Sequence, residues 1–153
     1  MKQLTDSMLD ALTLEARQSP RRRANRNLHE DLRDPVQRLA IAMEPDTYVR
    51  PHRHPHTWEM LSALRGRFVV LHFAAAGTVV GRAVLGEGCK VIENPAGLWH
   101  AVLSLDSGGI IFEVKQGPYA PVSESDYAPW SPAGELNAWY AAARVGDRLA
   151  ATG

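Results

Sequence analysis

The sequence contains a single cysteine, Cys89, so no disulfide within the chain can stabilise its fold. It also lacks long hydrophobic runs, because its most apolar stretch, residues 68–76, is broken by His72 and is too short to cross a bilayer. Lys2 and Asp6 interrupt the first residues, where a secretory signal peptide would be apolar. We therefore expect a cytoplasmic protein with no membrane-spanning segment.

No charge of one sign dominates the chain either. Seventeen Lys and Arg residues balance seventeen Asp and Glu residues, so no overall field attracts nucleic acid or an anionic membrane. The one local excess of charge, residues 21–23 with Arg26, is typical of a solvated segment leading into a domain. We therefore expect a small-molecule ligand, with no nucleic-acid or membrane partner, and leave a homodimer open.

The length of 153 residues suits one domain with a single hydrophobic core. An apolar stripe predicts a helix over residues 5–17, and a second stripe predicts a helix over residues 135–149. The expected organisation is an N-terminal helix in residues 1–20, a β-barrel domain in residues 21–132 and a C-terminal helix in residues 133–153.

Between these helices the hydrophobic period is close to two, which is typical of β-strands. Eight or so short runs, separated by close turn signals, predict an all-β sandwich or barrel. Residues 21–34 read instead as irregular and polar, and residues 118–134 as coil on the outside of the domain. The predicted strands cover residues 37–43, 47–49, 58–64, 67–73, 78–85, 90–93, 98–105 and 109–115.

Four residues in the strand region have the spacing of a metal site. His52 and His54 lie two apart, so on an extended segment both side chains leave the same face. Glu59 can follow from the next strand, and His100 can return from a distant strand after the turn at residues 95–97. Because Fe, Ni, Mn, Co and Zn all accept three imidazoles and one carboxylate, the sequence predicts one divalent metal ion on these four side chains.

Two motifs that contain these candidate ligands resemble the motifs of the cupin superfamily. The first runs from the two histidines through Glu59 to Gly66, and the second contains Pro95, Gly97 and His100. The resemblance implies an all-β, single-domain jelly-roll barrel that binds metal. Three positions that shape turns depart from the usual Gly, Gly and Asn of those motifs, namely Asp46, Cys89 and Ser104.

A narrower resemblance covers about residues 22–132. It is carried by residues 26–29, 36–38, 51–54, 58–59, 97–100 and 112–119. Over this range the chain resembles the WbuC family of cupin-fold metalloproteins. That family is associated with bacterial O-antigen gene clusters and its reaction is not settled, so the resemblance implies a fold, a metal and a lipopolysaccharide context, but no chemistry.

Three further candidate residues have ordinary interpretations. Pro55 tends to end a strand, so His56 is expected in an outer shell of the metal site or at the surface. His72, alone between apolar neighbours, is expected to be a structural residue with satisfied hydrogen bonds. Nothing near Cys89 would lower its pKa, so it is expected to be inert.

Arg38, Glu113 and Lys115 allow two interpretations. Glu113 and Lys115 are two apart on one predicted strand, and Arg38 lies opposite a face filled by Leu39 and Ile41. If these charges line the barrel, they must pair near the metal, because an unpaired buried charge costs several kcal/mol. If they face water, they form a surface ladder, and alternation alone does not choose between the two.

The basic segment before the first strand is also a candidate for ligand binding. We expect Arg26, Asn27 and His29 to close over the metal pocket and to hold an anion through fork-like hydrogen bonds. The alternative is a solvated linker. Arg38 and Trp99 complete the predicted substrate-binding set.

These residues favour a metal-binding protein that acts on a small anionic or sugar-derived molecule. Tyr48, Glu113 and Lys115, together with His29, are the candidate proton carriers for a metal-dependent isomerase or epimerase. With iron, the same site could instead activate dioxygen. The alternative from another class is a non-catalytic module that uses its metal to hold a sugar or an effector.

Overall fold

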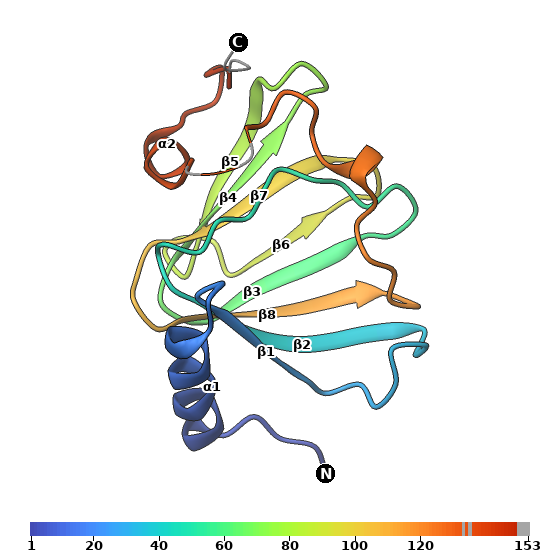
Figure 1. The fold of residues 1–153 in the computed structure, drawn as a ribbon, viewed down its shortest axis with the longest axis vertical. Coiled ribbons are helices and arrows are strands. Elements are labelled where there is room, and N and C mark those ends of the chain that lie inside the picture. The colour runs from blue at the N-terminus through green and yellow to red at the C-terminus, as the bar shows by residue number, and fades with distance from the viewer. Residues whose placement is uncertain (133, 135, 150–153) are drawn as a thin grey trace.

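The computed structural model describes residues 1–132, 134 and 136–149. Two antiparallel β-sheets form its body, with one helix near each end of the chain (Figure 1). This arrangement confirms the predicted all-β class with two short helices. The elements are α1 (Asp6–Gln18), β1 (Arg23–Asn27), β2 (Val36–Met43), β3 (Glu59–Arg65), β4 (Phe68–Phe73), β5 (Val79–Leu85), β6 (Val91–Asn94), β7 (Trp99–Ser104), β8 (Gly109–Gln116), the short helix η1 (Glu124–Asp126) and α2 (Asn137–Ala142).

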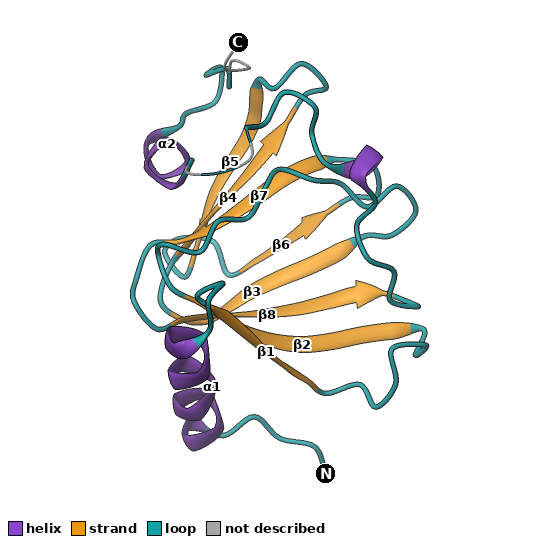
Figure 2. Cartoon of the chain, in the orientation of Figure 1, coloured by secondary structure: helices purple, strands orange, loops and turns teal. Residues whose placement is uncertain are grey.

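The larger sheet has the strand order β1-β2-β8-β3-β6, and the smaller sheet has the order β5-β4-β7. The chain passes repeatedly from one sheet to the other, so that β7 and β8, although consecutive, lie in different sheets (Figure 2). Side chains alternate across each strand, and the inward ones of both sheets meet in a common core. That core contains Ile41, Leu61, Phe68, Val70 and Ile111.

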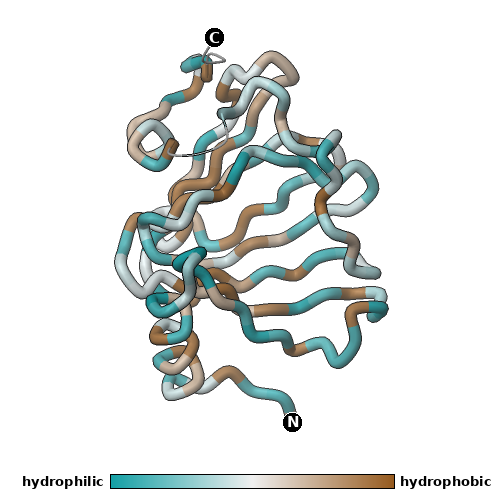
Figure 3. The backbone as a smooth tube through the Cα atoms, in the orientation of Figure 1, coloured by the Kyte–Doolittle hydropathy of each residue, from teal (hydrophilic) through white to brown (hydrophobic). Residues whose placement is uncertain are grey.

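Hydropathy along the chain follows this layering. Hydrophobic segments lie mainly in the strands and in α1, whereas β1 and the connecting loops are largely hydrophilic (Figure 3). Two satellite clusters cover the outer faces of the sheets. Polar residues border the space between the sheets from β1, from β8 and from the segment around the histidines.

Helix α1 matches the helix predicted over residues 5–17. Thr5 caps its N-terminus by accepting a hydrogen bond from the backbone N–H of Met8. Its buried side chains, among them Leu12 and Ala16, pack on Ala40 and other small or apolar residues of the larger sheet. This contact covers the outer face of β1, β2 and β8 at one end (Figure 2).

The segment predicted to be irregular contains a strand. β1 pairs antiparallel with β2, with Arg23 opposite Met43 and Asn27 opposite Leu39. Its backbone groups complete the edge of the larger sheet, although its sequence lacks the apolar residues that identify strands. Residues 47–49, predicted as a strand, are extended coil between β2 and the histidines.

The C-terminal part also differs from its prediction. Residues 118–132 cross the outside as coil with η1, as expected, but α2 covers only Asn137–Ala142. The predicted start at Glu135 and the tail 150–153 lie outside the described residues. Beyond α2 the chain runs instead beside the start of β5, where the Val79 backbone N–H donates to Asp147 and the Leu149 N–H donates to Gly77, just before the strand. No helix among the described residues is long and apolar enough to span a membrane.

Candidate metal centre

Three histidines that are far apart in sequence meet at one point between the sheets. His52 and His54 lie in the coil before β3, and His100 lies in β7. The backbones of His52 and His100 exchange two hydrogen bonds, with N–O distances of 3.0 and 2.8 Å. As a result, one ring nitrogen from each histidine lies within 4.8 Å of the others. The predicted convergence of the two motifs is thus a feature of the structure.

The rings of His52 and His100 are oriented by backbone carbonyls. Nδ1 of His52 lies 2.9 Å from the carbonyl oxygen of Arg50, and Nδ1 of His100 lies 3.0 Å from that of Leu98. A carbonyl can only accept, so each Nδ1 carries the hydrogen and the Nε2 lone pair is left for the centre. Burial, reinforced by the nearby His100, lowers the pKa of His52 to about 3, which keeps this ring neutral near neutral pH.

Glu59 places a buried carboxylate at the same point. Its Oε1 lies 2.9 Å from Nε2 of His100, and its Oε2 lies 3.3 Å from Nε2 of His54. Burial alone would raise the pKa of Glu59, but His100, His54 and Lys115 outweigh it and hold that pKa well below its ordinary value. For His100, burial lowers the pKa, yet the Glu59 carboxylate raises it above the ordinary value. Glu59 is therefore ionised, and the His100 imidazole beside it binds a proton more readily than usual.

This donor set fits a divalent metal ion. Nε2 of His100 is fully buried, and despite its short distance to Glu59 it has no partner with hydrogen-bond geometry among the residues that the structure describes. Such an orphaned ring nitrogen is expensive unless a cation uses its lone pair. His52, His54 and Glu59 converge on the same space with two more imidazoles and a carboxylate, the mixed set that borderline divalent metals accept.

A second layer of side chains holds Glu59 in place. Asn94, at the end of β6, donates from Nδ2 to Oε1 of Glu59 over 2.8 Å. The Oδ1 atom of Asn94 lies 2.6 Å from Nε2 of His72 in β4. The sequence predicts that His72 is a structural residue with satisfied hydrogen bonds, and His72 does bond to Asn94. Through Asn94, however, His72 is also linked to the candidate ligand Glu59. Asn94 was not recognised in the sequence, where a lone Asn at a strand end is typical of a turn.

The candidate metal centre lies beside a cavity of about 750 Å³. His52, His54 and Glu59 border it directly, while His100 lies behind them and is almost completely buried. The cavity occupies the space between the two sheets on the side where β1 forms the edge. Besides the ligands, its lining includes Arg21, Arg23, Asn25, Asn27, His29, Gln37, Tyr48, Glu113, Lys115, Tyr119 and Tyr127.

The strand register shows that Arg38 lies on a different face of the sheet from Glu113 and Lys115. Glu113 and Lys115 both point into the cavity from β8. Arg38 is opposite Val114, the residue between them, so its side chain leaves the other face and pairs with Asp34 at 3.6 Å. Arg38 is not part of the cavity lining, which corrects its assignment to the substrate-binding set.

Lys115 and Glu113 differ in their surroundings. The Lys115 ammonium lies 2.8 Å from Nε2 of His54 and 3.7 Å from Oε2 of Glu59, where it neutralises the carboxylate. Burial, together with the charge of Glu59, raises the pKa of Glu113 to about 7, although Lys115 and Arg23 oppose this shift. Near neutral pH, Glu113 is thus divided between its acid and base forms.

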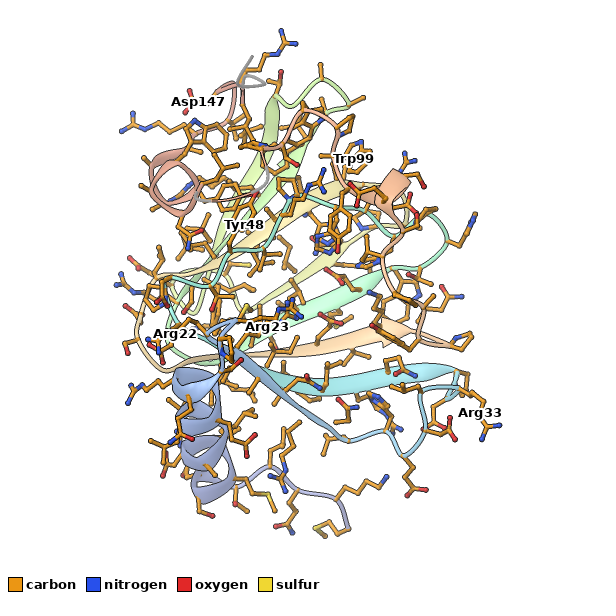
Figure 4. All side chains as sticks on the ribbon, viewed as in Figure 1. Arg22, Arg23, Arg33, Tyr48, Trp99 and Asp147 are labelled. Atoms are coloured by element: carbon orange, nitrogen blue, oxygen red, sulfur yellow. The ribbon has the colours of Figure 1, made fainter. Side chains whose placement is uncertain are left out.

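Two other predicted site residues are engaged elsewhere. The Tyr48 ring borders the cavity, but its hydroxyl donates to the carbonyl of Pro132 over 2.9 Å, and burial raises its pKa. Trp99 precedes His100 in β7 and so faces outward, with the Arg53 guanidinium 4.5 Å from its ring (Figure 4). The structure therefore does not support Tyr48 as a proton carrier or Trp99 as a ligand-binding residue, which corrects both assignments. Alternation along the segment, counted from His100, would have placed Trp99 outside.

Of the three residues expected to close over the metal pocket, two border the cavity and one does not. Asn27 and His29 border the cavity as expected, but Arg26 is exposed on the other face of the strand, which corrects its assignment. The sequence interpretation overlooked Arg23 and Asn25, which share the inward face with Asn27. Their spacing of two was the available signal, and it was missed because the segment was read as irregular. His56 is exposed and does not border the cavity.

Comparison with known proteins assigns the chain to a family. The family described as a domain of unknown function (DUF6016) matches residues 4–85, which is more than half of the chain. The chain belongs to this family. No curated protein matches the sequence.

Solved structures share the fold. KdgF from Halomonas sp. matches with a TM-score of 0.53 at 13% identity, over 67% of this chain and 85% of that one. An oxalate oxidase in complex with glycolate matches with a TM-score of 0.55 at 17% identity, over 69% of this chain and 56% of that one. The BH2720 protein from Bacillus halodurans matches with a TM-score of 0.56 at 17% identity, over 83% and 89%. These likenesses confirm the cupin jelly-roll fold.

Proposed function

We propose that this protein is a metal-dependent cupin that binds and transforms a small, oxygen-bearing anionic molecule. The observation that carries the proposal is the convergence of His52, His54 and His100 beside the ionised Glu59, at the wall of a cavity of about 750 Å³. These four residues would hold one ion of Fe, Ni, Mn, Co or Zn. A cavity of this size accepts a molecule as large as a sugar acid.

The charges of the site favour an anionic ligand. Three neutral imidazoles and one carboxylate leave a divalent ion with a net charge of about +1. When bound, such an ion supplies Lewis-acid polarisation of a ligand oxygen. The ammonium of Lys115 adds a second positive charge at the same wall.

Lys115 and Glu113 support proton transfer as the reaction. They lie two apart on β8 and both enter the cavity, one as a donor and the other as a carboxyl group with a pKa of about 7. A group that is half ionised near the working pH can accept a proton from one carbon or oxygen and return it to another. This pair favours an isomerase or epimerase over dioxygen chemistry, because a poised acid and base serve proton transfer directly. It also favours an enzyme over a non-catalytic binding module, which has no need of a poised acid and base.

The biological setting proposed here is bacterial surface-polysaccharide metabolism in the cytoplasm. It rests on the resemblance of residues 26–29, 51–54 and 112–119 to the WbuC family and on a sugar-sized cavity whose charges favour an anionic ligand. A sugar acid or a nucleotide sugar is the ligand class that fits both.

Elemental analysis of protein purified without added metal tests the metal centre. We expect about one divalent ion per chain, and loss of most of it in His52→Ala, His54→Ala and His100→Ala, because each removes one of four ligands. His56→Ala is the matched control, since His56 is exposed outside the cavity. Retention of the metal in His100→Ala, or equal loss in His56→Ala, would contradict the assignment. A screen of sugar acids and nucleotide sugars for proton exchange with solvent then tests the reaction class.

A further inference from the structure

The cavity contains an arginine that has no partner. Arg23 enters it from β1, and its side chain reaches into the space between the sheets (Figure 4). Among the described residues, no carboxylate lies within 4.0 Å of its guanidinium, and its side chain makes no hydrogen bond. Its neighbour Arg22, just before β1, pairs instead with Asp46 at 3.0 Å.

An unpaired arginine in this position is unusual. Protein atoms surround the guanidinium, and burial is the main reason that the pKa of Arg23 is lowered from its ordinary value. Solvent reaches the side chain only in part, through the cavity. Glu113 is the nearby charge that most favours the cationic form, but it is not in ion-pair contact with Arg23 in the described structure. A buried charge without a contact partner costs several kcal/mol of folding stability. Stability of the fold therefore does not explain why an arginine occupies position 23.

We propose that Arg23 binds an oxyanion of the ligand, a carboxylate or a phosphate, at a subsite separate from the metal centre. This inference rests on the proposed function, because it assigns the ligand class of the same cavity. The planar guanidinium offers five donors in a fork that matches carboxylate and phosphate oxygens. A ligand oxyanion would supply the negative charge that no described protein group places in contact with the Arg23 guanidinium.

The rest of the inward face of β1 suits the same ligand. Nδ1 of His29 lies 2.9 Å from the backbone nitrogen of Arg38 and 3.0 Å from its carbonyl oxygen, so Nε2 is the ring nitrogen left for another contact. That Nε2 is buried and has no partner among the described residues. Asn25 donates to the amide oxygen of Asn27 over 2.9 Å, and Asn27, which borders the cavity, keeps its amide nitrogen without an acceptor among the described residues. β1 and His29 thus present polar groups without partners among the described residues to an oxygen-rich molecule in the cavity.

The register shows why this subsite is distinct from the metal centre. Arg23 is opposite Met43, and Met43 is opposite Gly109, whereas Glu59 is opposite Lys115. Gly109 and Lys115 are six residues apart on β8, which separates the two backbone levels by roughly 20 Å. The long Arg23 side chain covers part of that separation. The ligand should therefore have oxygens for the metal at one end and its oxyanion several ångströms away.

Calorimetric titration with a matched set of probes tests the subsite. D-glucuronate and D-glucose differ in one carboxylate, and inorganic phosphate tests the other oxyanion. We expect wild-type protein to prefer glucuronate over glucose, or to bind phosphate, and Arg23→Gln to weaken the oxyanion by roughly 10- to 100-fold. Arg23→Lys should recover part of the loss, because it restores the charge without the fork.

Arg26→Gln is the matched control, because Arg26 lies on the same strand but is exposed on its other face. Thermal unfolding without probe provides a second readout. Because Arg23 is an uncompensated charge, the midpoint of Arg23→Gln should equal or exceed that of wild type. Wild-type protein that does not distinguish the oxyanions from glucose, or equal losses in Arg23→Gln and Arg26→Gln, would overturn the subsite.

Titrations with metal-free and metal-loaded protein separate this proposal from the proposed function. Arg23-dependent oxyanion binding without metal would support the subsite even if the four ligands held no ion. A loaded metal centre with no effect of Arg23→Gln would leave the metal function intact and refute the subsite.

Discussion

Asn94 joins Glu59 to His72 across the two sheets. Its Nδ2 donates to Oε1 of Glu59 over 2.8 Å, and its Oδ1 lies 2.6 Å from Nε2 of His72. Because the amide donates to the carboxylate, its oxygen must accept from His72, which places the His72 hydrogen on Nε2. Burial lowers the pKa of His72, so this ring stays neutral and the orientation of the Glu59 carboxylate is maintained.

Replacing Asn94 tests whether this link supports the metal centre. Asn94→Leu keeps the volume but removes the donor, so Glu59 becomes free to rotate and metal affinity should fall by roughly 10- to 100-fold. Competition with a chromogenic chelator measures the change. Glu93→Gln, on the exposed face of the same strand, should leave the affinity unchanged. An unaltered affinity in Asn94→Leu would show that Glu59 needs no support.

Removing the ammonium of Lys115 should strengthen metal binding. In the described structure the Lys115 ammonium contacts Nε2 of His54 and the carboxylate of Glu59. It therefore competes with a metal ion for two of the four candidate ligands. Lys115→Met keeps the aliphatic length without the charge, and we expect metal affinity to rise by roughly tenfold. Isothermal titration with Zn²⁺ measures it, with Lys90→Met at an exposed position as control. A weaker affinity in Lys115→Met would instead make Lys115 part of the metal site's support.

Glu44, which lies outside the cavity lining, should make the free energy of unfolding depend on pH. It accepts hydrogen bonds from Arg17 in α1, from Ser107 and from the backbone of Gly108. Burial by itself raises the pKa of Glu44, but these hydrogen bonds outweigh it and hold that pKa below its ordinary value. The stabilisation is therefore present above the pKa of the unfolded chain and is lost as pH falls through the lower pKa of the folded state.

Glu44→Gln measures this contribution. At about pH 7 we expect the free energy of unfolding to fall by roughly 1–3 kcal/mol, because a buried charged acceptor is lost. Below about pH 4.3 the difference from wild type should shrink as the carboxylate becomes protonated. Urea unfolding at several pH values gives both results, with the exposed Glu93→Gln as control. A difference independent of pH would mean that the charge of Glu44 contributes nothing.

The sequence by itself determined the features that depend on local pattern. Alternation between residues 36 and 115 established the all-β class, because the period of side chains along a strand is a property of the backbone alone. The stripe that ends at Ala16 predicted α1 within one residue at each end. The spacing of His52, His54 and Glu59, with His100 after its turn, identified the four side chains that the structure brings together.

Only the tertiary structure decided which face of each strand meets the cavity. Alternation divides a strand into two faces but does not say which is inside, so Glu113 and Arg38 could be separated only by the register of β2 against β8. The partners of Asn94 and the isolation of Arg23 depend on contacts between distant segments and have no local signal. β1 was missed for the same reason, because its backbone is held by the edge of β2 while its own side chains are polar.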